Sequence, residues 1–299
     1  MLRSLDTGIS GIRQFQTALD VIGNNLANVN TVAFKAGRAD FQDALLQTLK
    51  QPIADTSTRT GTSGVQVGNG VIVSAVKTEF NQGAINQTGV ATDLAINGDG
   101  FFIVKNAATG ELLATRSGDF RVDANGFVVT NGGFRLQGFS DPTSINSDHA
   151  EGDTTGDIAV DKGDISALGL DATADDAGIA TLNIDGAGKI NILLTDGSQY
   201  TRGQILLQKF QNPNALLKQG ANLYSGIAAA GALTDNDGIG TTPDTLGVGR
   251  IESRALEVSN VDIAREFANL ITTQRAFQAN ARVVTTSDQI LDEILRIVR

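Results

Sequence analysis

The sequence contains no cysteine and no tryptophan, and His149 is its one histidine. Without cysteine the chain can form no disulfide framework, thiolate metal site or thiol nucleophile. One histidine cannot make a paired-imidazole metal site, and a Ser-His-Asp triad would depend on His149 alone. Gly98-Asp99-Gly100 lacks the third glycine of a dinucleotide-binding loop. We therefore expect no enzymatic activity, cofactor or metal.

Long apolar runs and clustered bases are also missing. No run approaches the roughly 20 apolar residues that span a bilayer. Residues 1–6 lack the basic-then-apolar layout of a cleaved signal peptide, and no basic patch suits a phosphate backbone. We expect no membrane insertion, no nucleic-acid partner and no cleaved leader.

The formal net charge of −10 is concentrated in one segment. Residues 141–200 hold 12 acids against Lys162 and Lys189, whereas residues 1–140 hold 11 of each sign and residues 201–299 hold 10 of each. Like-charged copies repel one another, so neutral flanks suit surfaces that pack against further copies. We expect the start of the acidic segment to face solvent.

Both ends of the sequence have the apolar spacing of helices. Apolar residues recur every three or four positions from Leu2 to Val29, and again from Ala264 to Val298 with two polar interruptions. Asp262 suits a helix N-terminus, which predicts a helix over about 262–298. The opposite faces carry Asn, Gln and Thr instead of Lys and Glu. Spacing alone leaves three possibilities: an antiparallel helix pair on one domain, self-assembly, or binding of a partner.

The middle of the chain changes to short apolar or alternating runs separated by turn dipeptides, a pattern that predicts an antiparallel β domain. The expected strands are 71–76, 94–96, 101–104, 127–129, 179–184, 190–194 and 205–210. The expected turns are Asn69-Gly70, Asn97-Gly98, Asp99-Gly100, Asn125-Gly126, Asn131-Gly132, Asp185-Gly186, Asp196-Gly197 and Asp237-Gly238. We expect helical ends at 1–30 and 260–299, a connector over 31–70, and a β domain over 71–259 with an acidic insertion at about 141–176.

Three blocks of sequence closely resemble one protein family, the flagellar rod and hook family of bacterial axial proteins. The blocks are residues 19–35, residues 92–102, and residues 255–291 with their Thr273–Asn280 core. The resemblance implies an α+β fold, with an antiparallel all-β centre and long terminal helices that pair as a coiled coil around a channel. It also implies that the following residues take part in assembly: Asn24, Asn25, Leu26, Asn28, Asn30, Thr31, Phe34, Lys35, Ser259, Asn260, Val261, Asp262, Gln274, Arg275, Phe277 and Asn280.

Within this family the two ends look most like hook subunits, so we expect a flexible universal joint that transmits torque. Distal-rod subunits are the alternative, because Pro142–Gly169 is too short for the outer domain of larger hook proteins. The resemblance implies copies of the same chain, the distal rod, the hook cap, the hook–filament junction and the flagellar export apparatus as partners, and the extracellular flagellum as location. We expect the connector to decide between a flexible and a stiff tube. A β-rich secreted adhesin is a remote alternative, against which the absence of tryptophan for sugar stacking counts.

Overall fold

The structure is a computed structural model that describes residues 2–52, 60–61, 63–140, 155–160, 179–195, 197, 199–233 and 240–297. The chain forms two compact units. The helical unit comprises Met1–Val29, Ala36–Glu79 and Val261–Arg299, and the β unit comprises Asn30–Lys35 and Phe80–Asn260. The expected acidic insertion at 141–176 lies almost entirely outside the described residues.

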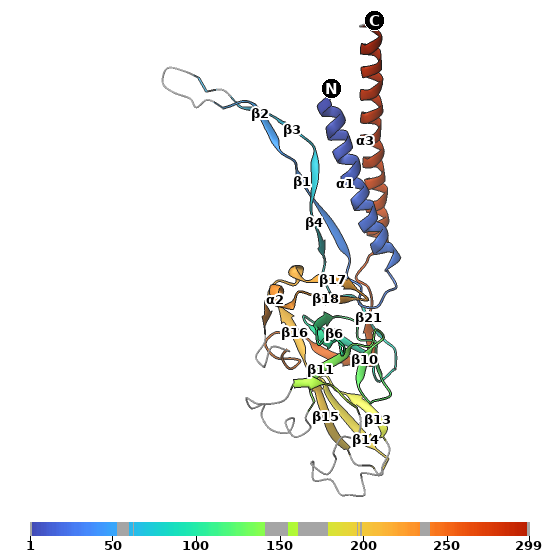
Figure 1. Ribbon diagram of the computed structural model, residues 1–299. Coiled ribbons are helices and arrows are strands. Elements are labelled where there is room, and N and C mark those ends of the chain that lie inside the picture. Colours follow the sequence, from blue (N-terminus) through green and yellow to red (C-terminus); the bar gives the residue numbers. More distant parts are fainter. Residues whose placement is uncertain are drawn as a thin grey trace. The chain divides into compact units, whose positions relative to one another are not determined.

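Two long helices, α1 (Leu2–Ala27) and α3 (Ile263–Ile297), lie side by side and antiparallel in the helical unit (Figure 1). Gly8 and Gly11 bring the backbones together, because a Cβ atom on Gly8 would lie 3.0 Å from Val284 Cγ2. The predicted helix over 262–298 is confirmed, and Asp262 caps it: its Oδ1 accepts the N–H groups of Ala264 and Arg265 at 2.9 and 3.2 Å. Neither of these two helices is apolar enough over a sufficient length to cross a membrane.

Residues 37–78 form two antiparallel ribbons in the helical unit. One pairs β1 (Gly37–Asp43) with β4 (Val71–Thr78), and the other pairs β2 (Leu46–Lys50) with β3 (Val65–Gly68). β4 pairs with β1, although the expected β domain begins at residue 71, and the expected connector over 31–70 contains strands that its pattern did not predict. The reason is that every residue of β2 and β3 is exposed, so no buried face imposes the alternation from which strands are predicted.

The β unit contains the remaining strands, and all its described pairings are antiparallel. The main path of its large sheet runs β13-β14-β15-β11-β7-β8-β18-β17, while β20 pairs with β6 and β21 with β5. The elements are β5 (Ile85–Gln87), β6 (Leu94–Asn97), β7 (Phe101–Lys105), β8 (Leu112–Thr115), β9 (Phe120–Val122), β10 (Val128–Thr130), β11 (Arg135–Phe139), β12 (Thr155–Asp157), β13 (Ile179–Ile184), β14 (Lys189–Leu194), β15 (Gln199–Ile205), β16 (Leu207–Phe210), η3 (Pro213–Ala215), β17 (Leu217–Gly220), β18 (Leu223–Ser225), α2 (Ile227–Ala230), β19 (Ala232–Leu233), β20 (Arg250–Ser253) and β21 (Ala255–Glu257).

The core of the β unit lies where its central strands meet. Phe102 and Val104 of β7 are fully buried, as are Leu136 of β11 and Ile190 of β14. A second cluster gathers aromatic rings around Phe101 on the other side of β7. Both faces of β7 are therefore covered, which explains its continuous apolar run.

The predicted turn dipeptides divide into two groups. Hairpins are confirmed at Asn125-Gly126 (β9–β10), Asn131-Gly132 (β10–β11), Asp185-Gly186 (β13–β14) and at Gly197 (β14–β15). Hairpins at Asn69-Gly70, Asn97-Gly98 and Asp99-Gly100 are wrong, because the strands on either side do not pair with each other: β3 pairs with β2, β4 with β1, β6 with β20 and β7 with β8. Asp237-Gly238 lies outside the described residues. The expected strand 205–210 is also interrupted at Leu206, which separates β15 from β16.

Candidate functional site

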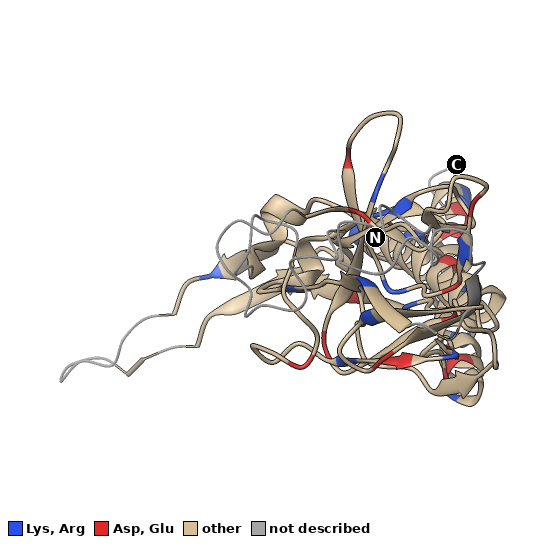
Figure 2. Ribbon diagram, turned by 90° about the horizontal axis from the view of Figure 1, so that it is seen from below, with Lys and Arg blue, Asp and Glu red and all other residues tan. Residues whose placement is uncertain are grey.

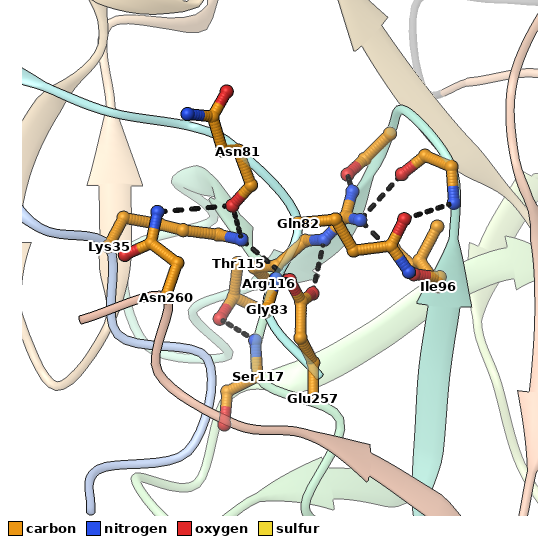
Figure 3. Close-up of polar contacts among 12 residues, drawn as sticks. Lys35, Asn81, Gln82, Gly83, Ile96, Thr115, Arg116, Ser117, Glu257 and Asn260 are labelled. Atoms are coloured by element: carbon orange, nitrogen blue, oxygen red, sulfur yellow. Dashed lines mark hydrogen bonds and ion pairs between the residues drawn. The ribbon is translucent and has the colours of Figure 1, made fainter. Parts of the chain in front are cut away.

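A buried ionic cluster in the β unit joins three distant parts of the sequence (Figure 3). Glu257, at the end of β21, places Oε1 2.6 Å from Lys35 Nζ and Oε2 2.7 Å from Arg116 Nε. The side-chain exposures of Lys35, Arg116 and Glu257 are 1%, 6% and 0%. Two cations and one carboxylate are thus held together away from water, where an isolated charge would be very costly.

Backbone groups complete the cluster. Lys35 Nζ donates to Asn81 O at 2.8 Å, and the Gly83 N–H donates to Glu257 Oε1 at 2.8 Å. Arg116 donates to three carbonyl oxygens, those of Ile96, Gly98 and Gly100. Gly83 must be glycine, since a Cβ there would lie 2.0 Å from Val258 O. The cluster therefore fastens β21, the β6–β7 turn and residues 31–35 to one another.

The charges in the cluster shift one another's titration. Burial alone would raise the pKa of Glu257, but Arg116 and Lys35 outweigh it by charge and hydrogen bonding and hold the pKa below its ordinary value. Burial lowers the pKa of Lys35 against the opposing charge of Glu257. Burial, and to a lesser degree Glu257, raises the pKa of Tyr224. Glu257 is accordingly an ionised carboxylate at neutral pH, and its role here is to compensate buried positive charge.

Of the predicted assembly residues, Asn25 and Asn28 shape the end of α1 in the helical unit. Asn25 is 1% exposed, and its side-chain amide both donates to Gly37 O and accepts from Gly37 N–H, each at 2.8 Å. Asn28 Nδ2 donates to Asn24 O at 2.9 Å. Leu26 is half-buried in the last turn of α1. Asn25 thus fixes where β1 begins relative to α1, and Asn28 closes the end of the helix.

A second group of predicted residues lies in the β unit beside the ionic cluster. The Phe34 N–H donates to Thr31 O, and the Asn260 N–H donates to Phe34 O, both at 3.3 Å. Asn260 Nδ2 also donates to Asn81 O at 3.1 Å, the same oxygen that Lys35 reaches. The structure thus brings the first and third sequence blocks together here, whereas Asn30 is exposed.

The remaining predicted residues lie on α3 or just before it. Gln274 and Arg275 are exposed, and Phe277 and Asn280 are half-buried. Asn280 lies against Gly11 of α1. Ser259 and Val261 belong to the segment between β21 and Asp262, the N-cap of α3. The sixteen predicted residues are therefore divided between the two units instead of forming one site.

Sequence reasoning missed Arg116 and Glu257 as site residues. A lone acid in the otherwise apolar stretch Ala255–Val258 is a signal that could have pointed to Glu257. Arg116 had no such signal, because its neighbours Thr115 and Ser117 are polar and its partners, Glu257 and backbone carbonyls, are far away in sequence.

A cavity of about 280 Å³ lies next to the cluster, with Phe80, Phe101 and Phe210 in its lining. Lys35, Arg116 and Lys209 also line it, but their nitrogens already donate to protein oxygens. Among the described residues no group of three His, Asp or Glu side chains is placed to hold a metal ion. The polar groups here serve the fold, and no arrangement suited to a reaction is formed.

Three protein families match successive parts of the chain. The family described as "Flagella basal body rod protein" matches residues 5–35. "Flagellar hook protein FlgE/F/G D1 domain" matches residues 95–192, and "Flagellar basal body rod FlgEFG protein C-terminal" matches residues 252–297. The three matches include Lys35, Arg116 and Glu257, one in each family.

Whole proteins align over nearly the full chain. The flagellar basal-body rod protein FlgG of Bacillus subtilis (strain 168) is 37% identical over 305 residues, covering 100% of both chains. FlgG of Borreliella burgdorferi is 33% identical over 297 residues, covering 97% of both. The flagellar hook protein FlgE of the same organism is 28% identical over 447 residues, covering 99% of this chain and 100% of the hook protein.

Proposed function

Because the chain belongs to the family of flagellar basal-body rod and hook proteins, we propose that it is a subunit of the flagellar rod that polymerises with copies of itself into a stiff tube. The family is structural and not enzymatic. The hook is the second candidate, since a hook protein is among the relatives.

We prefer a rod subunit to a hook subunit because of the lengths of the alignments. Both rod relatives align with this 299-residue chain over about 300 positions. The hook relative needs 447 positions to align, so it contains a large insertion that this chain lacks. This observation reverses the preference for a hook subunit that the two ends of the sequence suggested.

The helical unit supports a role as the inner layer of the tube. In the proposed polymer, α1 and α3 pair as a coiled coil around the channel, and the β unit faces outward. Apolar side chains of α3 support this role because several are about half exposed, among them Phe267 at 47% and Ile271 at 49%. Such exposure is costly for an isolated subunit and is relieved when copies pack together.

Further partners follow from the proposed place in the flagellum. The export apparatus carries the chain to the growing end, and hook subunits follow it there. If the chain is instead a hook subunit, its neighbours are the distal rod, the hook cap and the hook–filament junction proteins. The sixteen residues named from the family resemblance are proposed to act in assembly, with Asn25, Lys35 and Asn260 shaping the subunit from within.

Electron microscopy of the purified protein at high concentration tests the proposed function. We expect hollow, straight tubes, because a rod must transmit torque without bending. Curved tubes would favour the hook alternative. A solution of monodisperse globules at every concentration and salt condition tried would contradict both.

The β2–β3 ribbon is the proposed source of stiffness. Its apolar residues are exposed, with Leu46 at 51%, Leu49 at 57% and Val65 at 49%. Lys50 is the one charged residue in these two strands. Figure 2 shows that the ribbon carries few charged residues in comparison with the rest of the chain. A ribbon of this kind can wedge between neighbouring subunits and oppose sliding.

Exchange of residues 44–70, which contain both strands of this ribbon, for the matching segment of a hook homologue should therefore change the curvature of the tube. We expect straight tubes to become curved, because the wedge is replaced while the helices and the β unit remain. The matched control exchanges the same residues for those of the Bacillus subtilis rod relative and should leave the tubes straight. Tubes of unchanged curvature in the hook exchange would refute the role of this segment.

A further inference from the structure

The helix α3 extends past α1 in the helical unit. Ser4 Oγ lies 3.4 Å from Ser287 Oγ, and Gly8 and Gly11 lie against Val284 and Asn280. This antiparallel register brings the first turn of α1 level with about residue 289. Residues 290–297 of α3, which we call the overhang, therefore continue beyond the N-terminal end of α1 (Figure 1). At 1.5 Å per residue the overhang is about 12 Å long.

The overhang is apolar and acidic. Its exposed apolar side chains are Ile290 at 50%, Ile294 at 38%, Leu295 at 67% and Ile297 at 76%. Asp292 and Glu293 lie within it and Asp288 just before it, against Arg296 as the one base. Within the described residues, none of these three acids forms an ion pair. This short segment leaves both apolar surface and negative charge without a partner.

A surface of opposite charge lies nearer the N-terminal end of the same helix. Phe267, Ile271 and Arg275 follow at spacings of four, and Arg282 comes two turns later, so they share one face of α3. We call these four residues the outer stripe. They lie on the side of α3 away from Val284 and Ser287, which meet α1. Arg275 and Arg282 are the only charged residues between Phe267 and Thr285, and neither has an ion-pair partner in the described part of the chain.

These two surfaces complement each other in both polarity and charge. The overhang offers isoleucines and carboxylates, and the outer stripe offers Phe267, Ile271 and two guanidinium groups. Asp292 and Glu293 lie 10 to 18 residues from Arg275 and Arg282 on one straight helix, so no copy can fold back to pair them with each other. A second copy can pair them if it is shifted along the helix axis by roughly 15–30 Å.

Resting on the proposed self-assembly, we propose that the overhang of one copy docks on the outer stripe of the α3 helix of a neighbouring copy. The docking partner is a second copy of this chain, because each chain has both an overhang and the outer stripe that matches it in charge and polarity. The contact joins two different surfaces, so each added copy presents a fresh overhang and a fresh stripe. A contact of this kind generates an open helical polymer and does not close on itself as a two-fold dimer does.

Charge reversal tests the contact. The acid-reversed variant carries Asp292→Arg and Glu293→Arg, and the base-reversed variant carries Arg275→Glu and Arg282→Glu. We expect each to raise the lowest protein concentration that sediments as polymer at least tenfold. The variant that carries all four changes should assemble as the wild type does, because complementarity is restored. That recovery also separates a lost contact from a misfolded helix.

A matched double reversal on α1, Asp6→Arg with Asp20→Arg, serves as the control. Wild-type assembly by both two-site variants would overturn the contact and leave the proposed function intact. Equal damage by the α1 control, or no recovery in the four-site variant, would overturn it as well. Failure of the wild type to polymerise would instead overturn the proposed function, and this contact with it.

Cross-linking gives an independent measurement, because the chain has no cysteine of its own. Ile271→Cys and Ile290→Cys placed together should form disulfides between copies in the polymer, because their separation of 19 residues agrees with the proposed shift. Cysteines that form a disulfide have Cα atoms about 4.4–6.8 Å apart. The control pairs Ile290→Cys with Leu217→Cys, an exposed residue of the β unit. Ladders of cross-linked copies only in the first variant support the contact, and ladders in neither or in both contradict it.

Discussion

Replacing Glu257 by glutamine should lower the free energy of unfolding of the β unit by about 3–5 kcal/mol, the range measured when one partner of a buried ion pair is removed. Glutamine has nearly the same shape, so packing is kept and only the charge is lost. Lys35 and Arg116 would then remain as two buried cations that no carboxylate compensates. A loss of this size is a large part of the stability of an ordinary domain.

Unfolding in urea, monitored by tyrosine fluorescence, measures the change in the free energy of unfolding of the β unit. The chain has two tyrosines and no tryptophan, and Tyr200 and Tyr224 both belong to the β unit. Glu252→Gln is the matched control: Glu252 is half-buried and accepts a hydrogen bond from Asn97, and we expect a loss below about 1 kcal/mol. Similar stability of the two variants would contradict the role given to Glu257.

Two further measurements identify the charge as the cause. Lys35→Met combined with Glu257→Gln should cost less than the sum of the single changes, since they break the same pair. The pKa of Glu257 is lower in the folded chain than in the unfolded chain, where it is about 4.3. The ionised carboxylate therefore stabilises the fold above about pH 4.3, and this stabilisation is lost as the pH falls from there toward the pKa of the folded state. The wild type should therefore lose its advantage over Glu257→Gln in acid.

In dilute monomer, backbone amides of α1 and α3 should exchange with solvent orders of magnitude faster than those of β7. Ser287 is the one buried residue among those of α3 whose burial is described, whereas four of the five residues of β7 are buried. Helices gain most of their stability from tertiary packing, and Asn and Thr are poor helix formers. Joining the two ends of the chain also carries a loop-closure cost over more than 200 residues.

Hydrogen exchange with mass spectrometry makes this measurement peptide by peptide. The same protein after polymerisation is the control, and there residues 2–27 and 263–297 should become strongly protected because neighbouring copies cover them. Protection of both helices in the monomer equal to that of β7 would show that the helices are stable without neighbours. The helices would then need no assembly to become ordered.

Several features of the fold could be predicted from the sequence because they depend only on the local pattern of residues. The α3 helix follows from its apolar spacing and from Asp262, whose carboxylate caps it as expected. The hairpin at Asp185-Gly186 follows from a turn that local backbone preference selects. Local pattern failed at Asn97-Gly98, where Gly98 has a positive φ of 114° but the chain passes from β6 to β7 without pairing them. A dipeptide fixes the shape of a turn and not the partner of the strand that leaves it.

The sequence by itself determined the helical ends and the antiparallel β centre, because periodicity and turn residues act over a few neighbours, and the resemblance of three sequence blocks indicated the family. Only the tertiary structure decided that β1 pairs with β4 and β2 with β3, and that Lys35, Arg116 and Glu257 meet. The exposed β2–β3 ribbon has no buried face that would impose a pattern on its sequence, and Lys35 and Glu257 lie 222 residues apart. Such a contact depends on how the whole chain closes, and no short stretch of sequence contains that information.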